Sequence, residues 1–156
     1  MKIGITGSNG FIGYHLWLHI KYLCDDLKVI KLNRDLNEID KCDVIVHLAE
    51  KNRLLYASSL HEDDESLFGV YRRENKILFL DWAKRNNSKF QSMKIPNVFG
   101  PFCKPNYNSF VATFCHKIIN DEVVNANSNE VRLIYVQNLC KQIVDIIRKK
   151  GDEENY

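Results

Sequence analysis

The sequence predicts an α/β fold in which helices flank a parallel sheet, and three observations lead to this prediction. A short apolar run, Lys2 to Thr6, ends in a glycine-rich turn. Apolar residues at helical spacing then follow from Phe11 to Cys24. Val29 to Leu32 and Val44 to Leu48 are continuous apolar, β-branched runs, which are typical of parallel strands buried on both faces. The N-terminal third is therefore predicted to be α/β with a parallel sheet.

The rest of the chain contains further helices and strands. Helices are expected at Leu67 to Arg85, Asn108 to Asn120 and Val136 to Lys149. Strands are expected at Phe90 to Ile95, where Pro96 ends the strand, and at Val131 to Tyr135. Leu67, Tyr71, Leu78 and Trp82 fall on or near one face of the first of these helices. No repeat and no linker rich in Pro, Gly or Ser marks a boundary, so residues 1–156 are predicted to form a single domain.

Composition narrows the classes of function. The 156 residues are 45% hydrophobic and 27% charged, which is ordinary for a globular domain. The net charge of +2 gives no reason to expect nucleic acid as a partner. No apolar run approaches the ~20 residues that span a bilayer, and the N-terminus lacks a signal-peptide pattern. We therefore predict a cytoplasmic protein with no membrane partner.

Cysteine and histidine spacing predicts no metal site. Five cysteines are scattered without a C-x-x-C pair, namely Cys24, Cys42, Cys103, Cys115 and Cys140. This pattern argues against a disulfide framework or a zinc knuckle, and it predicts free, mostly buried thiols. His15 and His19 have the i, i+4 spacing of a metal-binding pair, but no third ligand is suggested.

The turn after the first strand has the pattern of a phosphate-binding loop. Its glycines stand at positions 7, 10 and 13, directly after a strand and at the start of a helix. Such a turn needs unusual backbone angles, and a pyrophosphate must approach the N–H groups of the helix start closely. The sequence predicts nucleotide binding, against the alternative of a tight turn without ligand, by the residues Gly7, Ser8, Asn9, Gly10, Phe11, Ile12 and Gly13.

The end of the second strand bears on the choice of nucleotide. It carries Asn33 and Arg34, where NAD enzymes usually have an acidic residue for the adenosine ribose. Because an arginine can pair with the 2′-phosphate, NADP(H) is favoured over NAD(H). The alternative is that Arg34 is a solvated loop residue and Asp35 holds the ribose.

Three motifs together resemble the extended short-chain dehydrogenase/reductase family, which acts on nucleotide sugars. These are T-G-x-x-G-x-x-G at Thr6 to Gly13, D-V-I-V-H-L-A at Asp43 to Ala49 and P-N-V-F-G-P at Pro96 to Pro101. Cys103 to Ser109, continuing into Val111 to Cys115, is similar to the reductase domain of CapF-type capsular polysaccharide synthesis enzymes. Members of that group reduce a UDP-linked 4-keto-hexosamine with NADPH.

The resemblance runs from Met1 to about Lys149 and implies a Rossmann-like NAD(P)-binding domain with a UDP-sugar as substrate. Leu48 and Ala49 would lie beside the cofactor. Polar and aromatic residues after a strand, at the carboxyl edge of a parallel sheet, suit sugar or diphosphate binding. The substrate-binding residues expected on this basis are Asn97, Cys103, Lys104, Asn106, Tyr107 and Asn108. The family's C-terminal cupin domain has no counterpart in the sequence.

The catalytic pair of the family is replaced. The resemblance implies a catalytic pair: a Tyr that transfers a proton, and a Lys four residues later that lowers the pKa of the Tyr phenol. No Y-x-x-x-K occurs here, and Phe68 and Arg72 stand at the matching positions. Ser59 is the better match, over Ser58, for the hydroxyl that holds the substrate. Tyr71 could replace the missing Tyr, but its i+4 neighbour is Asn75, and packing in the core is the favoured interpretation.

The connection after Ala49 is a second departure. Only residues 50–53 separate Ala49 from the serine-bearing strand, where the family has a helix. Four residues reach at most ~14 Å, while returning past a six-residue strand takes ~20 Å. We therefore expect an internally truncated fold in which Leu54 to Ser58 is not a parallel neighbour of Val44 to Val46, the local sheet is reorganised, or part of the preceding strand unravels.

Two functions are carried forward. One is an NAD(P)-binding epimerase, dehydratase or reductase of UDP-sugars for surface polysaccharide, with catalysis impaired by Phe68 and Arg72. The alternative is a non-catalytic nucleotide-binding remnant or partner subunit of a complete homologue. The resemblance implies a homodimer or heterodimer built from the long helices, although Arg73, Glu74 and Lys84 make this helix too polar to identify an interface. The acidic run from His61 to Glu65 is interpreted as a solvated loop and helix entry.

Overall fold

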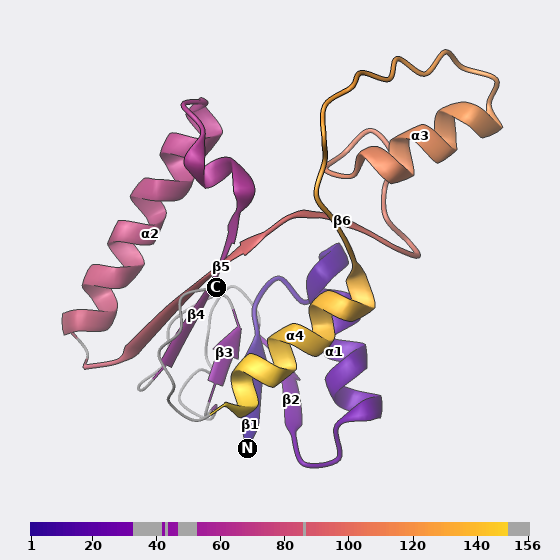
Figure 1. The fold of residues 1–156 in the computed structure, drawn as a ribbon. Helices are drawn as coiled ribbons and strands as arrows, with labels where there is room; N and C mark the ends of the chain where they lie inside the picture. Colours follow the sequence, from indigo (N-terminus) through magenta and orange to yellow (C-terminus); the bar gives the residue numbers. More distant parts are fainter. Residues whose placement is uncertain (33–41, 43, 47–52, 86, 150–156) are drawn as a thin grey trace.

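The computed structural model describes residues 1–32, 42, 44–46, 53–85 and 87–149. Both helices and strands occur along the described chain (Figure 1). In order they are β1 (Lys2–Ile5), α1 (Phe11–Leu23), β2 (Lys28–Lys31), β3 (Val44–Val46), β4 (Arg53–Ser59), the 3₁₀ helix η2 (Leu60–Asp63), α2 (Leu67–Arg85), β5 (Lys89–Ile95), β6 (Asn97–Phe99), α3 (Phe110–Ile119), β7 (Leu133–Tyr135) and α4 (Val136–Arg148).

The main sheet is parallel and doubly wound. Its described strands lie in the order β2-β1-β3-β4-β5, and each neighbouring pair is parallel. The strand order reverses direction between β1 and β3, and in open sheets of this kind ligands bind at the carboxyl ends of the strands beside such a point. The turn that follows β1 lies at this place, so the predicted Rossmann-like α/β fold is confirmed.

The core lies between the sheet and the pair α1 and α4. Strand residues such as Ile3 and Ile5 are buried against Leu16 and Ile20 of α1 and Ile143 of α4, all at most 1% exposed. Sustained apolar spacing on both helices produces this layer, because residues three and four positions apart share a helix face. An ion pair from Arg148 to Asp26 ties the end of α4 to the turn after α1, with 2.5 Å between Nη2 and Oδ1.

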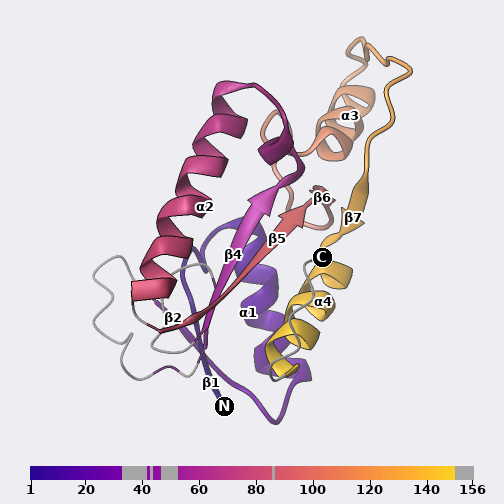
Figure 2. The same ribbon diagram turned by 60° about the vertical axis from the view of Figure 1, so that its left-hand side comes forward.

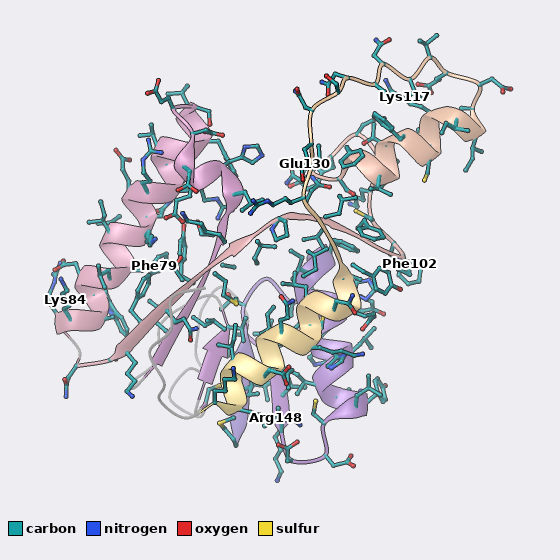
Figure 3. The ribbon with its side chains drawn as sticks, in the orientation of Figure 1. Phe79, Lys84, Phe102, Lys117, Glu130 and Arg148 are labelled. Carbon is teal, nitrogen blue, oxygen red and sulfur yellow. The ribbon has the colours of Figure 1, made fainter. Side chains whose placement is uncertain are left out.

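The other face of the sheet is covered by α2 (Figure 2). Tyr56 of β4 packs between Phe79 of α2 and Phe90 of β5, with ring centroids 5.2 and 6.4 Å apart. Adjacent Leu55 belongs to the opposite core, as expected when successive side chains of a strand point to opposite faces. In Figure 3, Phe79 extends from α2 toward the sheet.

The interpretation that Tyr71 of α2 packs in the core is wrong. The helix has the predicted bounds, but Leu67 is 90% exposed and both Tyr71 and Leu78 are 65% exposed. Tyr71 therefore does not pack in the core. Periodicity identifies a helix but does not say which of its faces meets the sheet, and here Gly69 and Ala83 are the buried residues of α2.

The expectation that Leu54 to Ser58 is not a parallel neighbour of Val44 to Val46 is wrong. β3 and β4 are parallel neighbours, with Ile45 opposite Leu54 and Val46 opposite Leu55. The described strand ends at Val46, so residues 47–52 are available to connect it to Arg53. Seven Cα steps reach up to ~24 Å. The return needed is only ~8 Å, because Arg53 starts two residues back along the neighbouring strand.

A smaller lobe follows the sheet. β6, which the sequence did not predict, pairs in parallel with β7, and α3 lies beyond them (Figure 1). All residues of α3 are at least partly exposed. No helix in the described part of the chain is both long and apolar enough to cross a membrane.

Candidate functional site

The glycine turn fixes the start of α1 against the end of β1. Gly7 has φ +62°, which favours glycine, and its carbonyl accepts a 2.9 Å hydrogen bond from the Gly10 N–H. A Cβ on Gly13 would lie 2.3 Å from the Gly7 oxygen, closer than any side chain permits. Only glycine at position 13 lets the helix approach the turn this closely.

The first N–H groups of α1 are available for an anion. Gly10 precedes the helix and, within the described residues, no side chain caps it. The N–H groups of a first helical turn point outward and carry the positive end of the helix dipole. A pyrophosphate is the kind of group that such a turn binds. The residues present therefore fit a dinucleotide, and they include the buried Ser8, which is 4% exposed.

Part of the predicted cofactor site cannot be placed. Asn33, Arg34 and Asp35, on which the preference for NADP(H) depends, lie outside the described residues, as do Leu48 and Ala49. The glycine turn from Gly7 to Gly13 lies where it was expected, at the carboxyl end of β1.

The positions that match the family's catalytic pair lie together on α2. The Arg72 guanidinium carbon lies 4.8 Å from the centre of the Phe68 ring, over its face. Nη1 of Arg72 also donates to the Ala57 carbonyl of β4 at 3.4 Å. A cation and a ring at i, i+4 thus occupy the end of β4, but the ring carries no hydroxyl, so it has no proton to transfer.

The two serines at the end of β4 have different roles. Ser58 is 5% exposed, and its hydroxyl donates to the Glu62 carboxylate. Ser59 is half-buried, and its Oγ accepts a 3.3 Å hydrogen bond from the His61 N–H at the start of η2. Ser59 therefore remains the candidate for the substrate hydroxyl, while Ser58 is already engaged inside the protein.

Glu62 is a buried acid that sequence reasoning missed. It lies in η2, only 5% exposed, and Lys76 of α2 donates to its carboxylate at 2.7 Å. The interpretation of residues 61–65 as a solvated loop is wrong at this position. The only sequence signal was a lysine 14 residues later, which becomes meaningful once α2 is known to fold back over η2.

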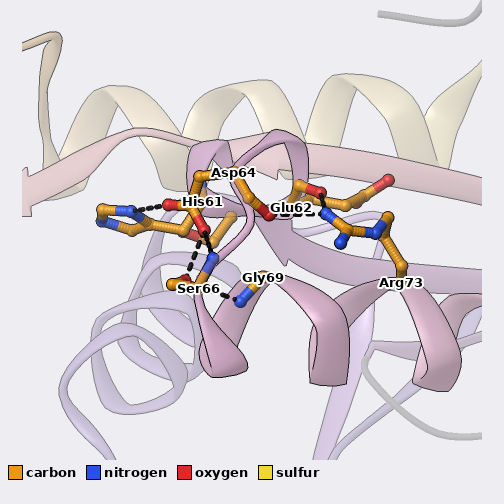
Figure 4. Close-up of polar contacts among 7 residues, drawn as sticks. His61, Glu62, Asp64, Ser66, Gly69 and Arg73 are labelled. Carbon is orange, nitrogen blue, oxygen red and sulfur yellow. Dashed lines mark hydrogen bonds and ion pairs between the residues drawn. The ribbon is translucent and has the colours of Figure 1, made fainter.

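Backbone contacts lock η2 onto the start of α2 (Figure 4). Nη1 of Arg73 donates to the carbonyls of Glu62 and Asp64 at 2.6 and 2.7 Å. The Ser66 Oγ accepts a 3.0 Å hydrogen bond from the Gly69 N–H. A Cβ on Gly69 would lie 2.4 Å from the His61 carbonyl oxygen. The candidate residues Ser59, Phe68 and Arg72 therefore lie on one corner of the fold, where η2 meets α2.

The predicted substrate residues form part of the smaller lobe. Asn97 donates from Nδ2 to the Asn108 carbonyl at 3.0 Å, whereas its buried Oδ1 has no hydrogen-bond partner within the described residues. Asn106 adopts φ +54°, and its N–H donates to Thr113 Oγ1 at 2.8 Å. Lys104 and Tyr107 are exposed and Cys103 is half-buried. The loop is thus anchored by its backbone and presents its polar side chains outward.

Metal-ligating side chains do not gather in the described part of the chain, where no group of three His, Cys, Asp or Glu residues lies together. All five cysteines are free, as predicted. Only Cys24 and Cys140 are fully buried, so the prediction that the thiols are mostly buried is wrong. Burial raises the pKa of Cys140 to about 12.

The buried carboxylate predicts an acid-sensitive element. Burial alone would raise the pKa of Glu62, but the hydrogen bonds from Lys76 and Ser58 and the nearby charge of Lys94 hold it below its usual 4.5. Its stabilising contribution is therefore complete above pH 4.5 and is lost as the pH falls through the lowered value.

We expect Glu62→Gln to lower the free energy of unfolding by about 1–2 kcal/mol at pH 7, because Lys76 loses its charged partner. The difference from the natural chain should shrink as the pH falls from 6 to 3 in urea titrations. Glu65→Gln, an exposed neighbour, should change stability by less than about 0.5 kcal/mol. A difference that stays constant with pH would contradict the assignment.

Comparisons with known proteins agree with this geometry. No protein-family model matches the chain. The chain is 27% identical over 188 aligned positions to UDP-2-acetamido-2,6-beta-L-arabino-hexul-4-ose reductase of Pseudomonas aeruginosa, which covers 96% of the chain. The chain spans about half, 50%, of that relative's length.

Solved structures show the same relationship. The capsular polysaccharide assembling protein CapF of Staphylococcus aureus superposes with a TM-score of 0.82 at 29% identity, over 99% of this chain and 51% of that one. UDP-N-acetylglucosamine 4-epimerase of Bacillus cereus shares the fold, with a TM-score of 0.78 at 17% identity over 100% of this chain and 74% of that one. The fold, the glycine turn and these likenesses show that the chain is similar to CapF-type members of the extended short-chain dehydrogenase/reductase family.

Proposed function

We propose that the chain binds a nicotinamide dinucleotide at the glycine turn, with NADP(H) preferred over NAD(H). The observation that carries this proposal is the close approach of Gly13 to the Gly7 carbonyl, which leaves the start of α1 open to a phosphate. Two solved structures of the same fold are described as complexes with NAD, those of UDP-glucuronic acid 4-epimerase and dTDP-glucose 4,6-dehydratase. The preference for NADP(H) rests on Arg34 in the sequence alone.

The second ligand that we propose is a UDP-sugar, bound by the smaller lobe. The P. aeruginosa relative is named as a reductase of a UDP-linked sugar, and a UDP-glucose 4-epimerase of this fold is described with UDP-glucose bound. Here the unpartnered Oδ1 of Asn97 could accept a hydrogen bond, and the exposed Lys104 could pair with a diphosphate. Tyr107, 72% exposed, offers a flat face to a sugar or base.

Catalysis depends on a proton that Phe68 cannot supply. A bound NADPH would supply the hydride for reduction of a 4-keto sugar. After that transfer the substrate oxygen would carry a negative charge and would need a proton, which Phe68 cannot give. Ser59 could hold this oxygen, and Arg72 could stabilise its negative charge. We therefore propose a binding protein with impaired catalysis, in a UDP-sugar pathway of surface polysaccharide. The alternative is a non-catalytic subunit of a complete homologue. A cytoplasmic location and a single-domain organisation stay predictions.

We also propose a dimer through α2. Leu67, Tyr71 and Leu78 share a face of this helix at i, i+4 and i+11, and all three are at least 65% exposed. Exposed apolar side chains grouped on one helix face mark interaction sites in soluble proteins, and Glu74 lies beside these three on α2. A second copy of this chain is the occupant that we favour, and a complete homologue is the alternative.

The cofactor proposal predicts micromolar binding of NADPH and weaker binding of NADH in calorimetric titration. Gly13→Ala should weaken NADPH binding at least tenfold, because its methyl group displaces the Gly7 carbonyl. The matched control is Leu23→Ala, a 69% exposed residue at the far end of the same helix, which should bind normally. A folded natural chain that binds neither nucleotide would exclude the proposal.

The catalytic proposal predicts that Phe68→Tyr/Arg72→Lys gains turnover. The natural chain should show NADPH oxidation with a UDP-4-keto-hexosamine near background, and the double variant should exceed it at least a hundredfold, since general acid catalysis contributes about 10²–10⁴-fold. Val70→Tyr/Glu74→Lys places the same pair on the nearly opposite face of the helix and should stay silent. Silence in both variants, with NADPH bound, would favour the non-catalytic subunit.

The dimer proposal predicts a mass of about twice the 18.3 kDa of one chain in light scattering. Leu78→Lys should shift the protein to the monomer, because it introduces a charge into the apolar face. Leu133→Lys, which alters a 44% exposed residue of β7, should leave the mass unchanged. A natural chain that is monomeric at high micromolar concentration would argue against self-association.

A further inference from the structure

His15 is a buried polar residue that the proposed function does not use. It lies in the second turn of α1 and is 3% exposed. Its ring meets Phe11 edge-on at 5.2 Å between centroids and lies 6.3 Å from the ring of Phe102. Figure 3 shows Phe102 on the loop beside α1 and the start of α4. A histidine enclosed this way needs partners for both ring nitrogens.

Both ring nitrogens of His15 have partners. Nε2 lies 3.0 Å from the Pro101 carbonyl oxygen, which can only accept, so Nε2 carries the proton and donates. Nδ1 then accepts from the side-chain amide of Gln137, 3.2 Å away on α4. One imidazole thus joins α1 to the loop after β6 and to α4, through contacts with residues 86 and 122 positions away in the sequence.

Two of the segments joined by His15 belong to the proposed binding sites. α1 begins at Phe11, directly after the glycine turn, and the Tyr14 N–H bonds to the Gly10 carbonyl within its first turn. Pro101 precedes the loop of Cys103 and Lys104, and the Cys103 N–H donates to the Gly100 carbonyl at 3.3 Å. A shift of α1 therefore moves the His15 imidazole, and a shift of the loop moves the Pro101 carbonyl to which that imidazole is hydrogen-bonded.

The loop is held in a conformation that needs such an anchor. Phe102 has φ +65° and Asn106 has φ +54°, backbone angles that are uncommon for residues other than glycine. Residues in these regions persist when surrounding contacts over-determine them, and they gather at ligand clamps. Phe102 is 82% exposed, so burial of its own side chain contributes little to holding it there. The Pro101 carbonyl, fixed by His15, is the adjacent anchor.

We propose that His15 couples the two sites, so that a dinucleotide at the glycine turn and a UDP-sugar at the Pro101 to Asn108 loop each strengthen binding of the other. This inference rests on the proposed function. The mechanism is positional: a ligand that orders the start of α1 also orders the imidazole, and through it the carbonyl before Phe102. The second ligand then meets a loop that is already ordered.

The test measures binding of NADPH and of UDP-N-acetylglucosamine by calorimetry, each alone and with the other saturating. In the natural chain we expect each ligand to lower the dissociation constant of the other by the same factor, at least about fivefold, because coupling of binding free energies is reciprocal. His15→Phe keeps the ring but loses both hydrogen bonds, and the factor should fall below about twofold. His15→Gln, which retains a donor for the Pro101 carbonyl, should recover part of it.

The matched control is His19→Phe. His19 lies one turn later on α1, is 8% exposed, and its Nδ1 has no partner within the described residues. The control should keep the coupling of the natural chain, which separates coupling from loss of a buried histidine. Binding of both ligands without mutual tightening, or full coupling in folded His15→Phe, would overturn this inference alone. Failure of the folded natural chain to bind either ligand would overturn it together with the proposed function.

Discussion

The close packing of Gly13 against the Gly7 carbonyl is the constraint on which the site depends. It sets the height of α1 above the end of β1, and a methyl group at position 13 would separate them. With the helix at this height, its first N–H groups open toward the carboxyl edge of the sheet, and His15 reaches the loop after β6. The binding edge and the smaller lobe are therefore positioned by one backbone contact.

The sheet accommodates a short connection because β3 itself is short in the described chain. Only two residue pairs of the described β3 are in register with β4, so the chain has a short distance to cover between the end of β3 and the start of β4. Parallel neighbours usually have a crossover of about ten to twelve residues or more, including a helix. Here only six residues, 47–52, separate the described end of β3 from the start of β4. The sheet face opposite α1 and α4 is covered by α2 and by side chains such as that of Leu32, whose Cδ1 lies 2.6 Å from where a Gly4 Cβ would be.

Local patterns in the sequence were enough to predict the main elements. Continuous apolar runs identified β1 to β3, and apolar spacing identified α1, α2 and α4 to within one or two residues. β6 was missed because its three residues, between Pro96 and Gly100, are too few to show a period. The arginine thought to select the cofactor lies outside the described residues, so the sequence remains the sole basis for that preference.

The candidate site was predicted where it depends on local sequence and missed where it depends on folding. The glycine turn follows from spacing along the chain, and the Phe68 and Arg72 positions are what the family resemblance implies. The burial of Glu62 does not, because it requires Lys76 to fold back over η2 and Ser58 to point inward from β4. The exposure of Tyr71 likewise depends on which face of α2 meets the sheet. Tertiary contacts of this kind override local pattern.

Because α2 buries few of its side chains, the region around it should be locally less stable than the layer formed by α1 and α4. This helix buries Gly69 and Ala83 fully, whereas α4 buries six of its residues in the main core. Much of its attachment at the start of the helix is polar, through Arg73 and through Lys76 to Glu62. Segments with few buried apolar contacts open at lower free energy than the core around them. The η2–α2 corner should therefore open as a cooperative unit while the α1–α4 layer stays folded, and in a cell this corner would be the entry point for proteases.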